Sequence, residues 1–481
     1  MSDLTLNIAA SGIEADQAEL DTAANNLSNV STPGYAEEVV NLSNMTPSTT
    51  SGVGEGVAVQ SVTEDGSSLY DQLNLVSQGQ LGSANEAASI QNLTQNAFPE
   101  PSTTGLQSQL SQLWTGLSTL ATQPSSTAAQ QSVVQDASEV SQRLNSTYSQ
   151  LSDVAQQLSN DFQGQGTTSG GYVGQANQLI NQIATLNGNI VAGQNGGRDV
   201  NSLVDQRRQA VDQLGTILGV RTTTEPDGTL TVMSGGIQLV SSTNAVDLQA
   251  TGSASSGDLG LETTNGNVLP AGGQIGALLT GVNTTIPTYQ SQLSSVADSL
   301  AQSLNTLQSN GVSPTGIPGA TSSAGAPPYA GAFLPSIFVN NASPTTYTPG
   351  SGSAQSIAVN PTLLANPSLL ATASGSATPG SATIDPTTAQ AMAAVGQAFG
   401  GPDDLYQALV GLVGSQTSEA NNNQTSAQAL SDSTAAQLSS VDGVDTNQET
   451  VNMLSAQQAY QATAAVINST TTALEALLAA V

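Results

Sequence analysis

The chain of 481 residues carries 35 carboxylates against five basic residues, all of them arginine, and its net charge is −30 at pH 7. Nucleic acids and anionic lipid headgroups are bound through lysine and arginine, so this charge excludes both as partners. The chain has no lysine, histidine or cysteine, which excludes zinc sites of nitrogen and sulfur ligands, P-loops, and Cys–His, Ser–His or Ser–Lys nucleophile–base pairs.

Hydropathy and composition set the general shape. No stretch approaches the roughly 18 apolar residues of a membrane span, so we expect no membrane insertion. The first five residues lack a basic and an apolar region, and any export is expected to use a route other than a signal peptide. Because aromatics make up only 3% of the chain, packing must rely on aliphatic residues and alanine in thin helical seams, which favours an elongated molecule. The low number of charges of either sign suits acidic surroundings, in which carboxylates are protonated.

Both ends of the chain carry apolar residues at strict seven-residue spacing. This spacing is typical of coiled-coil packing and predicts a helix over 4–28 and a closing helix after a break at 441–445. Spacing leaves open whether the two helices pair with each other or with copies of themselves, and in either case we expect an assembly interface. The predicted interface residues are Leu6, Ile13, Leu20, Leu27, Met453, Tyr460, Ile467, Leu474 and Val481.

The first helix is predicted to stop at a run of turn-forming residues. Amide side chains precede a Pro-Gly pair, in which proline fixes φ and glycine accepts a positive φ. We expect the run to set the shape of the exit from the helix rather than to bind a ligand. Its members are Asn25, Asn26, Asn29, Pro33, Gly34 and Tyr35.

Helical and β patterns alternate through the middle of the chain. Short β-type segments at 38–42 and 56–62 precede a helical region over 69–217, whose three-and-four-spaced apolar stripes indicate a bundle. Around Gly219 the period changes to two, with a Pro-Asp-Gly turn at 226–228, which predicts a hairpin or meander.

The later part of the chain begins with a predicted helix over 275–307. Residues 311–380 are rich in Pro, Ser, Thr, Ala and Gly, so we interpret them as an irregular, loop-rich region. Helical pattern returns over 387–438.

Together the patterns predict a mainly α fold with a smaller β-rich portion. We expect an elongated molecule with a terminal α-helical coiled-coil domain from both chain ends, a helical bundle domain and an outer β/irregular domain. The predicted boundaries are 1–40 with 441–481 for the terminal domain, 41–217 with 385–440 for the bundle, and 218–384 for the outer domain.

The many carboxylates are expected to be solvated. A carboxylate pair for glycoside hydrolysis stays possible, since Asp and Glu are scattered throughout. Asp442, Asp445 and Glu449 lack the spacing of a calcium loop, and a capping box formed by Thr446 and Glu449 at a helix start accounts for them better. We therefore predict no catalytic, cofactor or metal site.

Three segments carry a resemblance to a known family. Residues 24–35, ANNLSNVSTPGY, closely resemble the N-terminal motif of bacterial flagellar rod, hook and hook-associated proteins. Residues 201–214, NSLVDQRRQAVDQL, look like the helix-to-strand junction of the flagellar hook-associated protein 1 family. Residues 440–445 and 457–462 are similar to the closing helix of that family.

The resemblance implies a non-enzymatic structural subunit that joins hook to filament. It implies as partners copies of the chain in a ring, the hook protein, the adjacent hook-associated junction protein and a flagellar export chaperone. The implied location is the extracellular flagellum at the hook–filament junction, reached through type III export, with no cofactor. A hook or distal-rod protein, an exported carboxylate-dependent peptidoglycan hydrolase and a surface adhesin are the alternatives.

Overall fold

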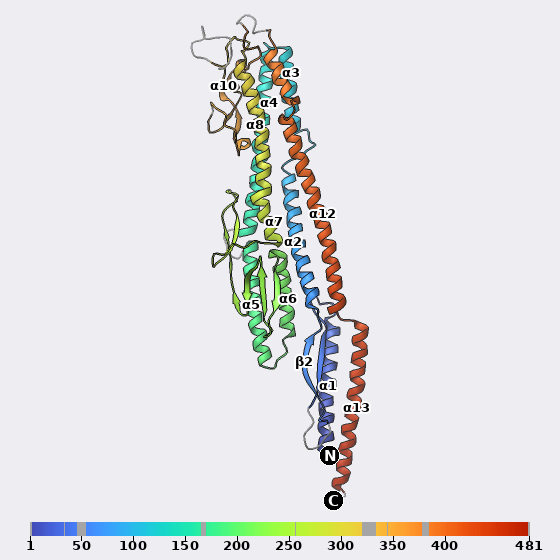
Figure 1. The fold of residues 1–481 in the computed structure, drawn as a ribbon. Coiled ribbons are helices and arrows are strands. Elements are labelled where there is room, and N and C mark those ends of the chain that lie inside the picture. The colour runs from blue at the N-terminus through green and yellow to red at the C-terminus, as the bar shows by residue number, and fades with distance from the viewer. Residues whose placement is uncertain are drawn as a thin grey trace.

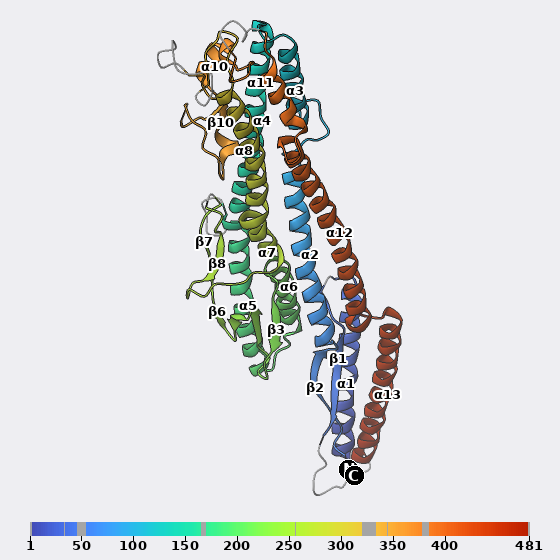
Figure 2. The ribbon, with the colours of Figure 1, turned by 45° about the horizontal axis from the view of Figure 1, so that its top comes forward.

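The computed structural model describes residues 2–32, 34–45, 54–164, 170–254, 256–319, 333–343, 345–377 and 384–479. These residues form a slender rod made mainly of helices that run along its length, with small antiparallel sheets on one side (Figure 1). Both chain ends lie together at one end of the rod (Figures 1 and 2). The predicted fold class, mainly α with a smaller β portion and helical termini, is confirmed.

The narrow end of the rod contains four elements, which we call the terminal module. Helix α1 (Ser2–Asn29) and helix α13 (Thr446–Ala479) lie side by side, although they are the first and last elements of the chain (Figure 2). Strands β1 (Glu38–Asn44) and β2 (Val57–Glu64) form an antiparallel hairpin that packs on α1. Most of the hairpin lies in the predicted 41–217 range, but it packs on the terminal helix α1 and reaches the helical body through Val62 and Glu64 at the end of β2.

Two long helices connect the terminal module to the rest of the rod. Helix α2 (Ser68–Gln95) and helix α12 (Pro402–Asp442) pack along each other and form a shaft (Figure 1). Between them the Ser77 and Thr434 hydroxyls share a hydrogen bond of 2.7 Å, and both side chains are buried. The shaft is thus joined partly through small polar side chains, in keeping with the shortage of bulky apolar residues.

The upper rod is a helical body with a continuous core. The predicted stripe residues Leu144, Leu151 and Leu158 are buried there, and Tyr289 is fully buried with its ring edge against Phe98. This stripe pattern is therefore confirmed as the seam of a bundle. The remaining helices of the body are α3 (Leu106–Thr122), α4 (Thr127–Gln163), α5 (Gly171–Asn195), α6 (Asn201–Leu218), α7 (Gly273–Thr280), the π-helical turn η1 (Gly281–Thr285), α8 (Ile286–Asn310), α11 (Thr387–Ala394) and the 3-10 turn η3 (Val395–Gln397).

A small β region lies beside α5 and α6. The predicted change of period after Gly219 is confirmed, because four strands form an antiparallel meander there. Asn187 of α5 holds the meander in place by donating to the backbone oxygens of Leu230 and Ser242. The strands are β3 (Arg221–Thr224), β4 (Leu230–Ser234), β5 (Ile237–Ser241) and β6 (Asn244–Ala245), followed by the separate pair β7 (Leu248–Thr251) and β8 (Gly260–Thr263).

The described part of 311–384 packs on the far end of the body in short, irregular pieces. Asn305 of α8 donates to the Phe338 backbone oxygen at 2.8 Å, and Gln308 donates to the Leu369 backbone oxygen at 2.9 Å. Helices α7 and α8 fall within the predicted outer range 218–384, yet they are part of the helical body. The short elements are β9 (Phe338–Asn340), α9 (Ser353–Ser356), β10 (Ile357–Val359), α10 (Pro361–Ala365) and the 3-10 turn η2 (Pro367–Leu369).

One glycine pair allows α2 and α6 to approach closely. A Cβ atom added at Gly82 would lie 2.3 Å from the Thr216 carbonyl oxygen, and one at Gly79 would lie 3.1 Å from the Gly215 carbonyl oxygen. We expect Gly82→Ala to lower the free energy of unfolding by about 1–3 kcal/mol, because backbone atoms must move apart.

The matched control for this prediction is Gly414→Ala in α12, where the added Cβ meets no atom within 4 Å. This substitution should raise the free energy of unfolding by up to about 1 kcal/mol through helix propensity. Urea denaturation measures both, and the same sign of effect at both positions would contradict the close approach of α2 and α6.

Candidate functional site

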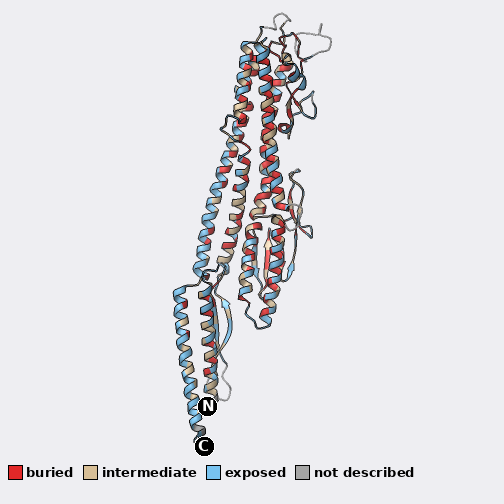
Figure 3. Ribbon diagram, turned by 180° about the vertical axis from the view of Figure 1, so that it is seen from behind, coloured by how far each residue is buried: buried red, intermediate tan, exposed pale blue. Residues whose placement is uncertain are grey.

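The predicted interface residues of the terminal helices are only partly covered within a single chain. Leu6, Ile13, Leu20 and Leu27 of α1 are half-buried, and Tyr460 of α13 is 38% exposed. Met453, Ile467 and Leu474 are also half-buried, whereas Val481 lies outside the described residues. Figure 3 shows the contrast between the largely exposed α13 and the buried seams of the helical body. Their role as an assembly interface stays a prediction.

Small and polar side chains form the contact between α1 and α13. A Cβ at Gly12 would lie 3.3 Å from Thr463 Cγ2, and the Thr463 hydroxyl donates to Asp16 at 3.1 Å. The fully buried residues of α13 include Ala456, at 2% exposure. Short side chains let the two helix axes approach but bury little apolar area, so this pair gains little free energy from burial.

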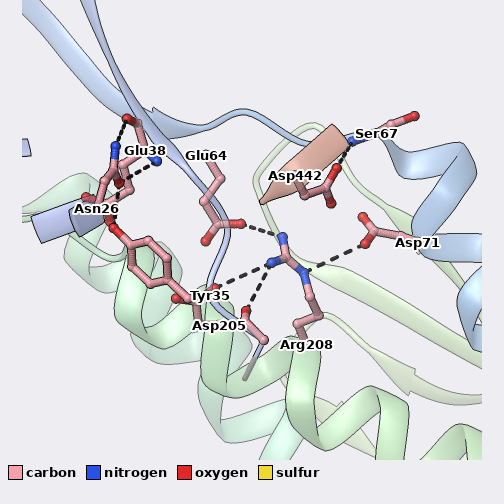
Figure 4. A network of polar contacts seen from close by, with 10 residues as sticks. Asn26, Tyr35, Glu38, Glu64, Ser67, Asp71, Asp205, Arg208 and Asp442 are labelled. Carbon is pink, nitrogen blue, oxygen red and sulfur yellow. Dashed lines mark hydrogen bonds and ion pairs between the residues drawn. The ribbon is translucent and has the colours of Figure 1, made fainter. Parts of the chain in front are cut away.

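At the base of the shaft lies a joint where three connecting segments meet: the turn at 30–37 between α1 and β1, the link at 65–67 between β2 and α2, and the link at 443–445 between α12 and α13. Asn26, near the end of α1, is completely buried in it. Its amide nitrogen donates to the Glu38 backbone oxygen at 2.9 Å and to Glu449 at 3.2 Å. Its oxygen accepts from the Tyr35 hydroxyl at 2.7 Å and from the Glu38 amide at 2.9 Å. One side chain thus ties α1, the turn, β1 and α13 together, and Figure 4 shows its contacts with Tyr35 and Glu38.

The other residues of the predicted turn shape the exit from α1. Asn25 donates to the Glu38 carboxylate at 3.1 Å, and Asn29 donates to the Asn25 side-chain oxygen at 2.8 Å. Gly34 has a φ of +82°, a conformation that side chains disfavour. Pro33 lies outside the described residues.

Arg208 of α6 connects the helical body to the terminal module. Its guanidinium lies 2.5 Å from Glu64 at the end of β2, 3.5 Å from Asp205 on α6 and 3.8 Å from Asp71 on α2 (Figure 4). It also donates to the Gly34 backbone oxygen at 3.4 Å. One arginine therefore contacts acidic groups from three elements.

Asp442, the last residue of α12, accepts hydrogen bonds from two of the connecting segments, 30–37 and 65–67. Its backbone oxygen accepts from the Glu37 amide at 2.9 Å, and its carboxylate accepts from the Ser67 amide at 3.2 Å. The ends of α12, β2 and the turn before β1 are thereby held at one point.

The structure corrects two expectations about carboxylates. Asp445, rather than Thr446, caps α13, because its side chain accepts from the Asn447 amide at 2.8 Å. Glu449 is 3% exposed and bonds Asn26 and Asn452, so it does not form the predicted capping box. The expectation that the carboxylates are solvated is wrong for this joint, where Glu38 and Asp442 are also buried.

Burial changes the acidity of the joint. It raises the pKa of Glu64 to about 7, more than Arg208 lowers it, and it raises the pKa of Asp212 to about 6. It also raises the pKa values of Asp71, Asp205 and Asp442. Burial lowers the pKa of Arg208, but Glu64, Asp71 and Asp205 more than offset this and hold it above its usual value.

The hollows near the joint are shallow and polar. One of about 280 Å³ is lined by Glu19, Glu37, Glu38 and Glu449, and another of about 450 Å³ between α2 and α6 is lined by Asp71, Asp212, Arg207 and Arg208. Within the described ranges, no three acidic residues are placed to hold a metal ion. Among the described residues, no helix combines the length and the hydropathy needed to cross a bilayer.

We expect Asn26→Asp to loosen the joint. The substitution removes two donors and places a negative charge beside Glu38 and Glu449, which should lower the free energy of local opening by about 2–5 kcal/mol. Thermolysin cleavage at 34–37 and 443–445 measures this opening. Asn29→Asp, at a site with only local side-chain bonds, is the control, and equal cleavage rates in the two variants would contradict the role of Asn26.

We also expect stability to fall as the pH rises. A carboxyl whose pKa is higher in the folded chain contributes stability that is complete below its unfolded pKa and is lost as the pH passes its folded value. For Asp212, whose pKa rises from 3.8 to about 6, this contribution to the free energy of unfolding is about 3 kcal/mol. It is lost as the pH rises from about 4 to about 6.

Urea denaturation at about pH 5 and about pH 8 measures the part of this fall that lies above pH 5, which is about 1.4 kcal/mol for Asp212. Asp212→Asn should reduce the difference, whereas Asp153→Asn, at an exposed position of α4, should leave it unchanged. Stability that increases with pH over this window would contradict the prediction.

Comparison with known proteins places three parts of the chain in flagellar families. Residues 90–321 match the family described as "Flagellar hook-associated protein FlgK helical domain". Residues 6–35 match the family "Flagella basal body rod protein", and residues 440–480 match "Flagellar basal body rod FlgEFG protein C-terminal". These last two ranges cover α1 and α13 of the terminal module.

Individual relatives agree with these matches. Flagellar hook-associated protein 1 of Escherichia coli strain K12 is 27% identical over 330 residues, which are 65% of this chain and 58% of that protein. The Bacillus subtilis strain 168 protein of that name is 24% identical over 232 residues, 46% of this chain and 44% of that protein. The chain thus spans less than two thirds of the length of these curated relatives.

A solved structure, the flagellar hook junction protein FlgK from Burkholderia pseudomallei, shares the fold. It superposes with a TM-score of 0.61 at 18% identity, and the match covers 76% of this chain and 99% of that one. The fold and both terminal motifs agree with this, and residues 90–321 of the chain belong to the helical-domain family of the flagellar hook-associated protein FlgK.

Proposed function

We propose that this protein is a structural subunit of the bacterial flagellum that joins the hook to the filament. The observation that carries the proposal is the terminal module, in which helices from both chain ends pair through small residues and leave their apolar stripes partly exposed. The family membership of residues 90–321 supports the same role.

The exposed apolar surface gives the physical reason for assembly. Besides the stripe residues, Val451, Leu454 and Val466 of α13 are each exposed by 45% or more. Covering these side chains with a neighbouring subunit contributes about 25 cal/mol for each Å² of apolar area removed from water. A chain with a charge of −30 and five arginines has few ion pairs to offer, so apolar contact is the available source of affinity.

The proposal includes the partners and the location. Copies of the chain form a ring through their terminal modules, with the hook protein on one side and the adjacent hook-associated junction protein on the other. The subunit leaves the cell through the flagellar export channel, bound beforehand by an export chaperone, and acts outside the cell. Pull-down with purified hook protein and with the chaperone tests each partner separately.

We propose that the protein is not an enzyme. The chain has no histidine, cysteine or lysine. The carboxylates of the joint form hydrogen bonds and ion pairs that connect its helices and strands. The rival function is a carboxylate-dependent peptidoglycan hydrolase. Release of soluble fragments from purified cell wall would favour the hydrolase, and no release at high protein concentration would favour the structural role.

A hook or distal-rod protein is the rival within the flagellum. The terminal motifs match rod families, so they do not separate these functions. The helical domain over 90–321 is the feature that favours the junction protein. Complementation of strains lacking either the junction protein or a rod protein distinguishes them, and rescue of the junction strain alone is expected.

We predict that Ile467→Asp abolishes incorporation into the flagellum while the helical body stays folded. Ile467 is half-buried on α13. If neighbouring subunits cover this position, burial of an unpaired aspartate charge there strongly disfavours assembly. The assay is filament formation in the complemented junction strain, with circular dichroism of the purified variant to establish folding.

Ser469→Asp is the control for this experiment. It adds the same charge to the same helix at an exposed position two residues away. Normal filaments with Ser469→Asp and none with Ile467→Asp are the expected pair. Normal filaments with Ile467→Asp would refute an interface at this stripe.

A further inference from the structure

The joint contains more acid than its single bridging arginine can neutralise. Around Arg208 lie carboxylates from four elements, β2, α2, α6 and α12, and the second nearby cation, Arg207, is occupied by Asn187 and the Gly228 backbone oxygen. The titratable groups that interact with Glu64 are Tyr35 before β1, Glu38 on β1, and Asp205, Arg207 and Arg208 on α6. Asp71 on α2, Asp212 on α6 and Asp442 on α12 interact with Arg208 from its other sides.

Glu64 is placed differently from the other acids of the joint. One carboxyl oxygen accepts from Arg208, while the other, Oε1, is buried and has no hydrogen-bond partner among the described residues. The Asp205 and Glu64 carboxyls both contact the Arg208 guanidinium, which brings them close enough for a hydrogen bond when one of them carries a proton. Two carboxylates at this distance repel each other, but a proton between them converts the contact into a hydrogen bond.

The two carboxyls belong to different parts of the rod. Glu64 ends strand β2 of the terminal module, and Asp205 lies on α6 of the helical body. A bond between them therefore fixes the module relative to the body at a point where the chain passes through short connecting segments (Figure 4). We propose that a proton shared by Glu64 and Asp205 locks this joint, and that its loss to solvent releases the terminal module to move relative to the helical body.

The proton balance follows from the surrounding groups. With the proton present, the Glu64–Asp205 pair carries one negative charge, which Arg208 neutralises. Without it, the pair carries two negative charges beside Glu38, Asp71 and Asp442, and Arg208 neutralises only one. Water must then enter to solvate the exposed Oε1, which separates β2 from α6.

The transition falls near neutral pH. Burial raises the pKa of Glu64 to about 7, so the carboxyl is mostly neutral at about pH 5.5 and mostly ionised at about pH 8.5. The joint is thus predicted to be stiff in mildly acidic medium and mobile in mildly alkaline medium. This inference concerns the single chain and does not depend on the proposed function.

The natural absence of cysteine allows a direct test in the full-length protein. Cysteines introduced at Ala462 on α13 and Gln182 on α5, both exposed, carry spin labels on the terminal module and on the helical body. Pulsed electron paramagnetic resonance then gives the distribution of distances between the two spin labels. Its width should increase by about twofold or more from about pH 5.5 to about pH 8.5 as the locked population is lost.

Glu64→Gln is the decisive variant, because its amide donates to Asp205 and its oxygen accepts from Arg208 at any pH. Its distribution should stay narrow at both pH values, while Asp153→Asn should behave as the unaltered protein. If Glu64→Gln fails to fold by circular dichroism, Asp205→Asn, which supplies a permanent donor from the other side, takes its place. An unaltered protein whose width does not change, or a Glu64→Gln variant that broadens equally, would overturn the proposal.

Discussion

Hydrogen bonds from the buried Asn26 and the half-buried Arg208 hold the base of this rod together. Asn26 uses both its amide and its oxygen to join α1, the following turn, β1 and α13, and Arg208 bonds the turn and the end of β2 to the helical body. Around them the chain passes twice between the terminal module and the rest of the rod, through the short segments 65–67 and 443–445. The direction of the terminal helices relative to the rod therefore depends on polar bonds, since few apolar residues are buried there.

The helical body and the terminal module therefore differ in stability. The helical body has a continuous core of buried leucines and the aromatic pair Phe98 and Tyr289. The α1–α13 pair has Gly12, Ala456 and Thr463 at its contact, with larger apolar residues left partly exposed. A subunit that is stable by itself in the body and incomplete in the terminal module is suited to polymerise without unfolding, because assembly only has to complete the weaker part.

Periodicity predicted most of the fold, because helix seams and alternating strands leave direct marks in the sequence. The stripe at Leu144, Leu151 and Leu158 and the change of period after Gly219 both correspond to observed elements. The joint was less predictable. The turn residues were found from their turn chemistry, but Arg208, Glu64 and Asp442 are far apart in the sequence and carry no local pattern that shows burial. One signal existed: an arginine in a chain with only five is more often needed as an ion-pair partner than as a solvated charge.

Amide hydrogen exchange on the soluble monomer tests most directly whether the terminal module is incomplete without its neighbours. We expect rapid exchange along α1 and α13 and strong protection in α4 and α8, with protection of the terminal helices appearing only after assembly. Equal protection of α1, α13 and the helical body in the isolated monomer would contradict the account.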